Sequence, residues 1–136
     1  MEDCIFCKIA EKKIPALIVY EDSKVISFLD IMPANKGHCL VVPRSHAATL
    51  IEMSDDDLSA TIKAAKKVAE AISLSFGNGG FNLVMNNGKN AGQLVDHAHI
   101  HIIPRFEKDR LRIKWSHLKY ENDEMKEYAE KIKKFL

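Results

Sequence analysis

The alternation of polar and apolar positions is sharpest at residues 97–103, which read His-Ala-His-Ile-His-Ile-Ile. Strict alternation is typical of a β-strand with one polar face and one buried face, because successive side chains point to opposite sides. The pattern predicts a strand over 97–103. Ala98, Ile100 and Ile102 then face a core, and the three histidines share the other face.

The remaining pattern predicts four more strands and two helices. Short apolar runs bounded by turn residues indicate strands at 17–20, 25–29, 38–42 and 81–85. Ser54, followed by three aspartates, is a good helix N-cap, and Gly77 is a typical C-terminal stop. Between them, apolar residues recur every three or four positions: Leu58, Ile62, Ala65, Ala69, Ile72 and Phe76. A second amphipathic helix is predicted within 121–136. This order of elements favours an α+β domain with an antiparallel sheet.

Size and charge narrow the class of protein. A chain of 136 residues fits one domain, here divided into a core at 1–105 and a tail with its helix at 106–136. The formal charge of +1 argues against general binding to nucleic acid or membrane. The acidic N-terminus lacks the layout of a signal peptide. We therefore expect a cytoplasmic protein whose three cysteines are reduced thiols.

The polar face of the predicted 97–103 strand suggests chemistry. His97, His99 and His101 would form a row of imidazoles, and imidazole is a common acid, base, nucleophile or metal ligand near neutral pH. A single histidine is more often an ordinary surface or core residue, but three in register favour a functional site. The pair Cys4 and Cys7 is a weak signal alone, because redox pairs and chance both produce this spacing.

Taken together, these motifs resemble the histidine triad (HIT) family of nucleotide hydrolases and transferases. The pattern His-φ-His-φ-His-φ-φ is met throughout 97–103, and the segments Asp30-Ile31, Gly37-His38 and Gly92-Gln93 extend the match. The resemblance runs from Cys4 to Arg105. It implies a five-stranded antiparallel sheet with flanking helices, extended across a homodimer. The N-terminal cysteines resemble those of zinc-containing bacterial members of the Hint-like branch.

The resemblance also implies a metal site. Zinc-containing members place their ligands at the positions of Cys4, Cys7, His46 and His97. Such a Cys2His2 site has no open coordination position, so the expected zinc is structural. The alternative is two buried free cysteines beside an ordinary surface histidine. No organic cofactor is expected, and Cys39 is expected in the core.

The resemblance assigns the nucleophile to His99. Its imidazole would attack the α-phosphorus of a purine nucleotide and form a covalent nucleotidyl-histidine that water then cleaves. His101 is expected to form a hydrogen bond near the phosphate. His38 matches a family residue that orients the nucleophile, although a histidine at a strand edge is also ordinary.

The family's nucleotide contacts carry over residue by residue. Asp30 would hold the ribose hydroxyls, and Asn86 would contact the phosphate or the leaving-group oxygen. Gly92, Gln93 and Leu94 match a Gly-Gln-Ser/Thr segment, but leucine lacks the hydroxyl that relatives use. The expected base slot, whose members could equally be core residues, consists of Ile5, Phe6, Ile9, Phe28 and Ile31.

Several functions fit these residues. The leading hypothesis is hydrolysis of a purine nucleoside phosphoramidate, giving an AMP-type product. A dinucleoside polyphosphate hydrolase is the nearest alternative, and Leu94 motivates a nucleotide-binding module with little turnover. A further reading makes the histidines a catalytic metal site. Trp115, by analogy with tail tryptophans of Hint-like dimers, would reach the leaving-group site of the partner subunit.

Overall fold

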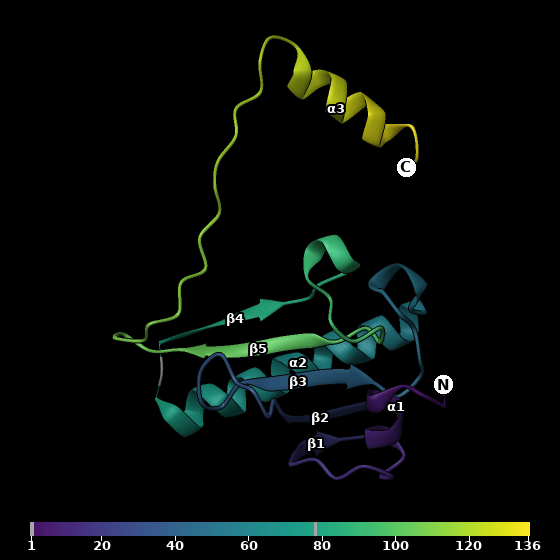
Figure 1. The fold of residues 1–136 in the computed structure, drawn as a ribbon, viewed down its shortest axis with the longest axis vertical. Helices are drawn as coiled ribbons and strands as arrows, with labels where there is room; N and C mark the ends of the chain where they lie inside the picture. The colour runs from purple at the N-terminus through teal and green to yellow at the C-terminus, as the bar shows by residue number, and fades with distance from the viewer. Residues whose placement is uncertain (1, 78) are drawn as a thin grey trace.

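The computed structural model describes residues 2–77 and 79–136, which form a five-stranded antiparallel sheet with helices around it (Figure 1). The strands are β1 (Ile18–Glu21), β2 (Val25–Leu29), β3 (Cys39–Pro43), β4 (Gly80–Val84) and β5 (Ile100–Arg105). Their order in the sheet is β1-β2-β3-β5-β4. Strands that follow one another in the sequence are therefore neighbours, except that one long connection joins β3 to β4. The predicted α+β fold with an antiparallel sheet is confirmed.

The long helix α2 (Asp55–Phe76) covers one face of the sheet. It begins as predicted, because the Ser54 side chain accepts a hydrogen bond from the Asp57 N–H at 3.1 Å. It ends at Gly77, whose φ of 59° suits glycine. The predicted apolar stripe was partly wrong, since Ile62 and Phe76 remain 46% and 51% exposed.

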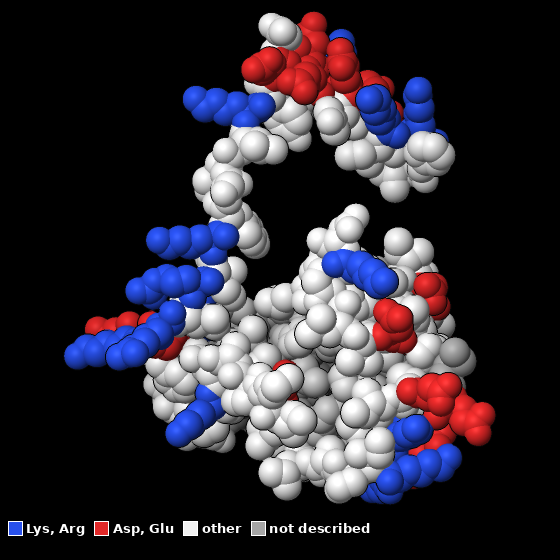
Figure 2. Space-filling model, in the orientation of Figure 1, with Lys and Arg blue, Asp and Glu red and all other residues white. Residues whose placement is uncertain are grey.

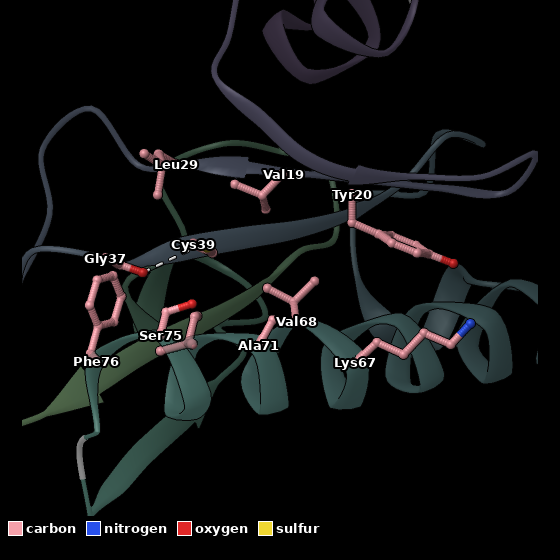
Figure 3. Close-up of a pocket in the computed structure, with 11 residues that line it drawn as sticks. Val19, Tyr20, Leu29, Gly37, Cys39, Lys67, Val68, Ala71, Ser75 and Phe76 are labelled. Atoms are coloured by element: carbon pink, nitrogen blue, oxygen red, sulfur yellow. Dashed lines mark hydrogen bonds between the residues drawn. The ribbon is translucent and has the colours of Figure 1, made fainter.

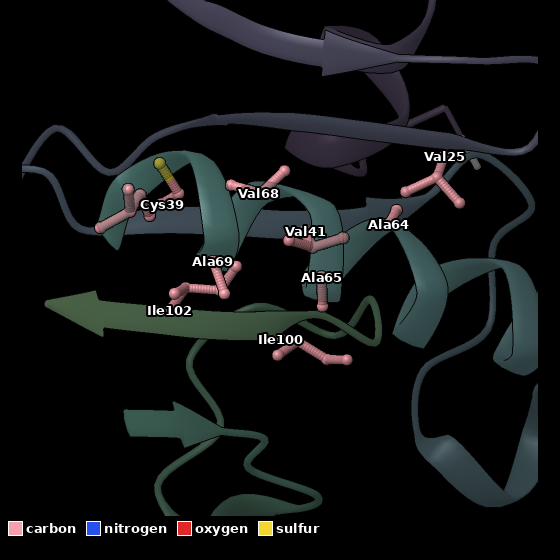
Figure 4. Packing of buried hydrophobic residues seen from close by; sticks show 10 residues of the cluster. Val25, Cys39, Val41, Ala64, Ala65, Val68, Ala69, Ile100 and Ile102 are labelled. Carbon is pink, nitrogen blue, oxygen red and sulfur yellow. The ribbon is translucent and has the colours of Figure 1, made fainter. Parts of the chain in front are cut away.

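Small side chains explain where α2 meets the sheet. The buried positions of α2 are Thr61, Ala64, Ala65, Val68, Ala69 and Ile72. Alanines let the helix backbone approach the sheet closely, so the larger Ile62 and Phe76 lie at the edges of the contact. Val25, Val41, Ile100 and Ile102 meet these alanines from the strands (Figure 4). Cys39 lies in this core, as expected.

The opposite face of the sheet carries a second core cluster beneath the short helix α1 (Ile5–Ala10). The sequence pattern did not predict this helix and indicated only an apolar segment, since α1 has no side-chain cap. Its inward residues pack on strands β2 and β3. The cluster contains Phe6, Ile9, Ile26, Phe28, Leu40 and Val42.

The predicted strand over 97–103 begins later than expected. Strand β5 starts at Ile100, and the segment before it bends: the Ala98 N–H donates to the Ala47 carbonyl at 2.7 Å rather than to a neighbouring strand. The first two histidines of the row therefore precede β5. Ala98, Ile100 and Ile102 are nevertheless buried as predicted.

The C-terminal tail extends away from the domain (Figure 1). An extended stretch leads from β5 to α3 (Glu124–Lys133), which is shorter than the predicted 121–136. Two short 3-10 helices, η1 (Leu50–Glu52) and η2 (Lys89–Ala91), occur in connecting loops. In the described part of the chain, no helix combines the length and apolar character needed to cross a bilayer.

Candidate active site and metal site

Two neighbouring strands bring the first pair of predicted active-site residues together. His38 immediately precedes β3 and His101 is the second residue of β5, and these strands are adjacent in the sheet. The His38 Nε2 and His101 Nδ1 atoms lie 2.9 Å apart. The predicted partner of His38 was the expected nucleophile, His99, whereas the structure pairs His38 with His101.

Hydrogen bonding fixes the proton positions on this pair. The Ala34 N–H donates to His38 Nδ1 at 3.0 Å, so in neutral His38 the proton is on Nε2. That proton points at His101 Nδ1, which accepts it. The proton of neutral His101 must then be on Nε2. His101 therefore presents an N–H donor at its far edge.

His99 is fixed by a different group. Its Nδ1 lies 2.7 Å from the His97 carbonyl oxygen, which can only accept, so Nδ1 carries the proton. The Nε2 lone pair is left available. The ring packs edge-on against Phe6, with centroids 5.0 Å apart, and lies beside His101 at 4.8 Å. A backbone carbonyl, rather than a neighbouring imidazole, thus selects the tautomer in which Nε2 of His99 carries no proton.

Burial keeps His38 and His101 neutral. Burial first, then nearby His99 and His38, lower the pKa of His101 to about 4, against an opposing effect of the Asp30 charge. Burial also lowers the pKa of His38, opposed by the negative charge of Asp30. At neutral pH both rings therefore act as hydrogen-bonding groups without charge.

Asp30 lies at the same end of the sheet. Its Oδ2 is 3.6 Å from His38 Nε2, and its Oδ1 accepts a hydrogen bond from the Met32 N–H at 2.9 Å. These contacts leave the partly exposed carboxylate with acceptor capacity for a ligand. The structure thus brings Asp30 to the histidine pair.

The four predicted metal ligands converge on one point. Cys4 Sγ is 3.3 Å from His97 Nδ1, and Cys7 Sγ is 3.5 Å from the Nδ1 atoms of both His46 and His97. These two Nδ1 atoms are 3.2 Å apart. Tetrahedral zinc with these ligands would separate them by roughly 3.3 to 3.8 Å. The donor set of Cys4, Cys7, His46 and His97 therefore fits zinc.

The tautomer of His97 also fits a metal. Its Nε2 lies 2.8 Å from the Pro43 carbonyl oxygen, so Nε2 carries the proton and the Nδ1 lone pair points into the cluster. The ring is fully buried, and burial lowers its pKa to about 4. His97 is therefore neutral and ready to act as a ligand.

The loop expected to contact phosphate is shaped by Gln93. Its amide donates to the Ala48 and Val95 carbonyls and its oxygen accepts from the Gly88 N–H, all at 2.6 to 2.9 Å. The side chain of Gln93 is thus used in bonds to backbone groups of its own loop and of Ala48, and is not directed at a ligand. A Cβ on Gly92 would lie 4.0 Å from Asn86 Nδ2, which places these two predicted residues together.

The predicted base-slot residues separate into two groups. Phe6, Ile9 and Phe28 are buried in the second core cluster, which is the alternative that the sequence left open. Ile5 and Ile31 are exposed, at 46% and 93%. Leu94 is 92% exposed.

Two surface hollows differ in their relation to these residues. An open groove of about 620 Å³ is bordered by Ile5 and Leu94 and by the candidate metal ligands Cys4 and His46. A smaller apolar hollow of about 250 Å³ lies on the α2 side of the sheet, with Lys67 at one end and Phe76 at the other (Figure 3). The imidazoles face the opposite side of the sheet.

Three of the groups that organise the site belong to the backbone. The Ala34 N–H and the carbonyls of Pro43 and His97 set the tautomers of three histidines. Any residue type supplies such groups, so no sequence signal could have identified them.

Comparisons with known proteins agree with this geometry. The family model of the HIT domain matches residues 11–108. An uncharacterized HIT-like protein of Methanocaldococcus jannaschii is 49% identical over 96% of this chain and 98% of its own length. An adenosine 5′-monophosphoramidase of Schizosaccharomyces pombe is 41% identical over 95% of each chain.

Solved structures show the same fold. A HIT family protein of Bacillus subtilis superimposes with a TM-score of 0.92 at 40% identity, over 98% of this chain and 97% of that one. A zinc-bound histidine triad family protein of Mycobacterium smegmatis gives a TM-score of 0.78 at 32% identity, over 85% of this chain and 84% of that one. The chain belongs to the HIT domain family.

Proposed function

We propose that this protein hydrolyses purine nucleoside phosphoramidates through a nucleotidyl intermediate on His99. The observation that carries the proposal is the hydrogen bond from His99 Nδ1 to the His97 carbonyl, which leaves the Nε2 lone pair as a nucleophile beside His101. The relative of S. pombe named as an adenosine 5′-monophosphoramidase supports this reaction class.

The reaction divides into two displacements. His99 Nε2 attacks the α-phosphorus, a bond from nitrogen to phosphorus forms, and the amine, protonated from solvent, leaves with the electrons of the broken bond. Water then attacks the same phosphorus, loses a proton to solvent, and releases the monophosphate and His99. The His97 carbonyl stabilises the positive charge that develops on the attacking ring.

His101 and His38 stabilise the phosphoryl group. The His101 Nε2–H would donate to a phosphoryl oxygen, where negative charge grows during attack. His38 holds that proton in place through its bond to His101 Nδ1. We thus propose that His38 positions His101 and does not act on the nucleophile.

The nucleotide would span the end of the sheet. Asp30 is placed to accept hydrogen bonds from the ribose hydroxyls, and Asn86 with Gly92 borders the phosphate loop. Ile5 and Leu94, on the rim of the 620 Å³ groove, remain candidates for contact with the nucleotide. Trp115 is 81% exposed and available to a neighbouring subunit.

We propose that Cys4, Cys7, His46 and His97 hold a structural zinc ion. The separations and the His97 tautomer support this, as does the zinc-bound M. smegmatis relative. Bound zinc would tie the N-terminal segment to the bend before β5. The cytoplasm, where thiols stay reduced, suits such ligands.

We further propose a homodimer formed through β4. This strand lies at the edge of the sheet, and Phe81 and Leu83 on it are 42% and 43% exposed. With Ile62 of α2 they line an apolar groove of about 450 Å³. An apolar edge strand of this kind favours pairing with another copy.

The direct test is turnover of adenosine 5′-phosphoramidate by wild type and by His99→Ala. We expect release of AMP by the wild type and only background release by the variant. Equal rates for the two proteins would refute the proposal.

Leu94 favours a second candidate, a nucleotide-binding module with little turnover, because it removes a side-chain donor to phosphate. That candidate predicts tight binding of AMP with no release of amine. Measuring both quantities on one preparation separates the two functions.

A further inference from the structure

The apolar hollow of about 250 Å³ on the α2 side of the sheet is not used by the proposed reaction (Figure 3). Val19 and Leu29 line it from the strands, and Val68 and Ala71 line it from α2. An apolar cavity of about 150 Å³ is large enough to hold benzene. The hollow therefore has room for a ligand somewhat larger than benzene.

One end of the hollow carries a positive charge. Lys67 Nζ lies there, 5.6 Å from the centre of the Tyr20 ring. Among the residues that the structure describes, no carboxylate oxygen lies within 4.0 Å of this ammonium group. The nearby Asp22 carboxylate already accepts from the Tyr20 hydroxyl and from the N–H groups of Lys24 and Val25, at 2.7 to 2.8 Å. Lys67 is therefore available to pair with an anionic ligand.

The other end of the hollow is closed by Phe76, whose ring lies against Gly37 (Figure 3). Lys67 and Phe76 are nine positions apart on α2, which corresponds to roughly 13 Å along the helix axis. Ala71 lies between them, four positions after Lys67 and on the same side of the helix. With C–C bonds of about 1.5 Å, an extended acyl chain of about eight carbons fits between the two ends. The length, the apolar walls and the cationic end thus match a medium-chain carboxylate.

The wall of the hollow is also the back of the candidate active site. Leu29 and Gly37 line the hollow, and they immediately precede Asp30 and His38 in the chain. Cys39, the residue after His38, lines it too. A ligand in contact with Gly37 therefore acts one residue away from His38.

Charge distinguishes the hollow from the opposite face of the sheet. In Figure 1 α2 lies behind the strands, so Figure 2 views the face that carries the imidazoles. Lys and Arg side chains on that face lie mainly around the rim and along the tail, rather than over the middle of the sheet (Figure 2). A carboxylate thus meets less positive charge there than at Lys67.

We propose that the hollow is a second ligand site, which binds a medium-chain fatty acid with its carboxylate on Lys67 and its acyl chain extended along α2 toward Phe76. The bound chain contacts Gly37 and thereby shifts the His38 ring. The hollow is lined from β1, β2 and β3, toward the edge of the sheet remote from β4. It therefore stays open in the proposed dimer.

Titration calorimetry with octanoate tests the ligand class. We expect saturable binding with a Kd of about 1 mM or lower. Octanol and octylamine carry the same chain with a neutral and a cationic head. We expect each to bind at least about 2-fold more weakly, because neither can form the exposed ion pair with Lys67. No saturable binding of octanoate, or equal Kd values for the three compounds, would overturn the proposal.

Variants of α2 test where octanoate binds. Lys67→Met keeps an apolar side chain of similar length, and loss of its charge should raise the Kd by about 2- to 5-fold. Lys131→Met is the matched control, because Lys131 Nζ also lies over a tyrosine ring, 5.4 Å from the centre of Tyr128, but on α3. Its Kd should equal that of the wild type.

Ala71→Phe fills the hollow from an exposed position of α2 and should raise the Kd by at least about 10-fold. Circular dichroism confirms that each variant is folded. Equal Kd values for Lys67→Met and Lys131→Met, or unchanged binding by Ala71→Phe, would contradict the proposed site.

Imidazole NMR signals test the link to the active site. Titration with octanoate should shift the ring signals of His38 and His101, with half of the change at the calorimetric Kd. The signal of His117, which is exposed on the tail, should stay in place. Unchanged signals of His38 and His101 while octanoate binds would overturn the link. None of these measurements uses turnover, so their failure is distinct from failure of the proposed hydrolysis.

Discussion

At the scale of single residues, three backbone groups give chemically identical imidazoles different tasks. The His97 carbonyl leaves a lone pair on His99, the Pro43 carbonyl leaves one on His97, and the Ala34 N–H acts through His38 to leave an N–H on His101. The row of histidines was evident from the sequence. Their roles depend on partners up to 93 residues away along the chain, which spacing alone does not reveal.

Substitution of Leu94 tests whether the loop before β5 contacts the phosphate. A hydroxyl at this exposed position would add one hydrogen bond to phosphate, worth about 0.5–1.5 kcal/mol. We expect Leu94→Ser to raise kcat/KM for adenosine 5′-phosphoramidate by about 2- to 12-fold. Leu94→Ala is the matched control and should give no gain. Equal rates for the two variants would show that position 94 does not contact the phosphate.

At the scale of elements, strong local signals predicted structure well. Strand β2 has the predicted bounds, and α2 begins and ends at its predicted caps. The predicted start of β5 was wrong because alternation also arises in a bent segment, in which His97 turns toward Cys4 and Cys7 while His99 packs on Phe6. Helix α1 could not be predicted from the sequence, because six residues are too few to show a helical period of apolar positions.

The loop that carries His38 depends on a close contact with α2. Gly37 has φ +94°, and a Cβ there would lie 2.7 Å from Phe76 Cε2. We expect Gly37→Ala to lower the free energy of unfolding by about 1–3 kcal/mol in urea titrations. Gly79→Ala is the control, since nothing lies within 4 Å of a Cβ added at Gly79. This variant should change the free energy of unfolding by less than about 0.5 kcal/mol. Similar losses in both variants would contradict this account.

Partly buried His101 makes stability depend on pH. Its pKa falls from 6.5 to about 4 on folding, so between these values the unfolded chain binds a proton that the folded protein does not. Stability is therefore full above pH 6.5, falls as pH drops toward 4, and levels off below. The slope from this group approaches about 1.4 kcal/mol per pH unit. Urea titrations at several pH values should show a shallower slope for His101→Asn, and an unchanged slope would contradict the assignment.

At the scale of the whole molecule, the proposed zinc joins the N-terminal segment to the bend before β5. Removing the metal with a chelator should lower Tm by about 5 °C or more, because the four ligands, of which Cys7 and His97 are buried, lose their shared partner. Activity should fall along with stability. Loss of activity with an unchanged Tm would indicate a catalytic metal and contradict a structural role.

The central claim is a covalent nucleotidyl intermediate on His99. The most direct measurement is the intact mass of the protein quenched within milliseconds of mixing with adenosine 5′-phosphoramidate, followed by peptide mapping. The account predicts one added adenylyl group per subunit, located on His99, labile to acid and absent from His99→Ala. Rapid release of AMP with no adduct at any time, or an adduct on another residue, would contradict it.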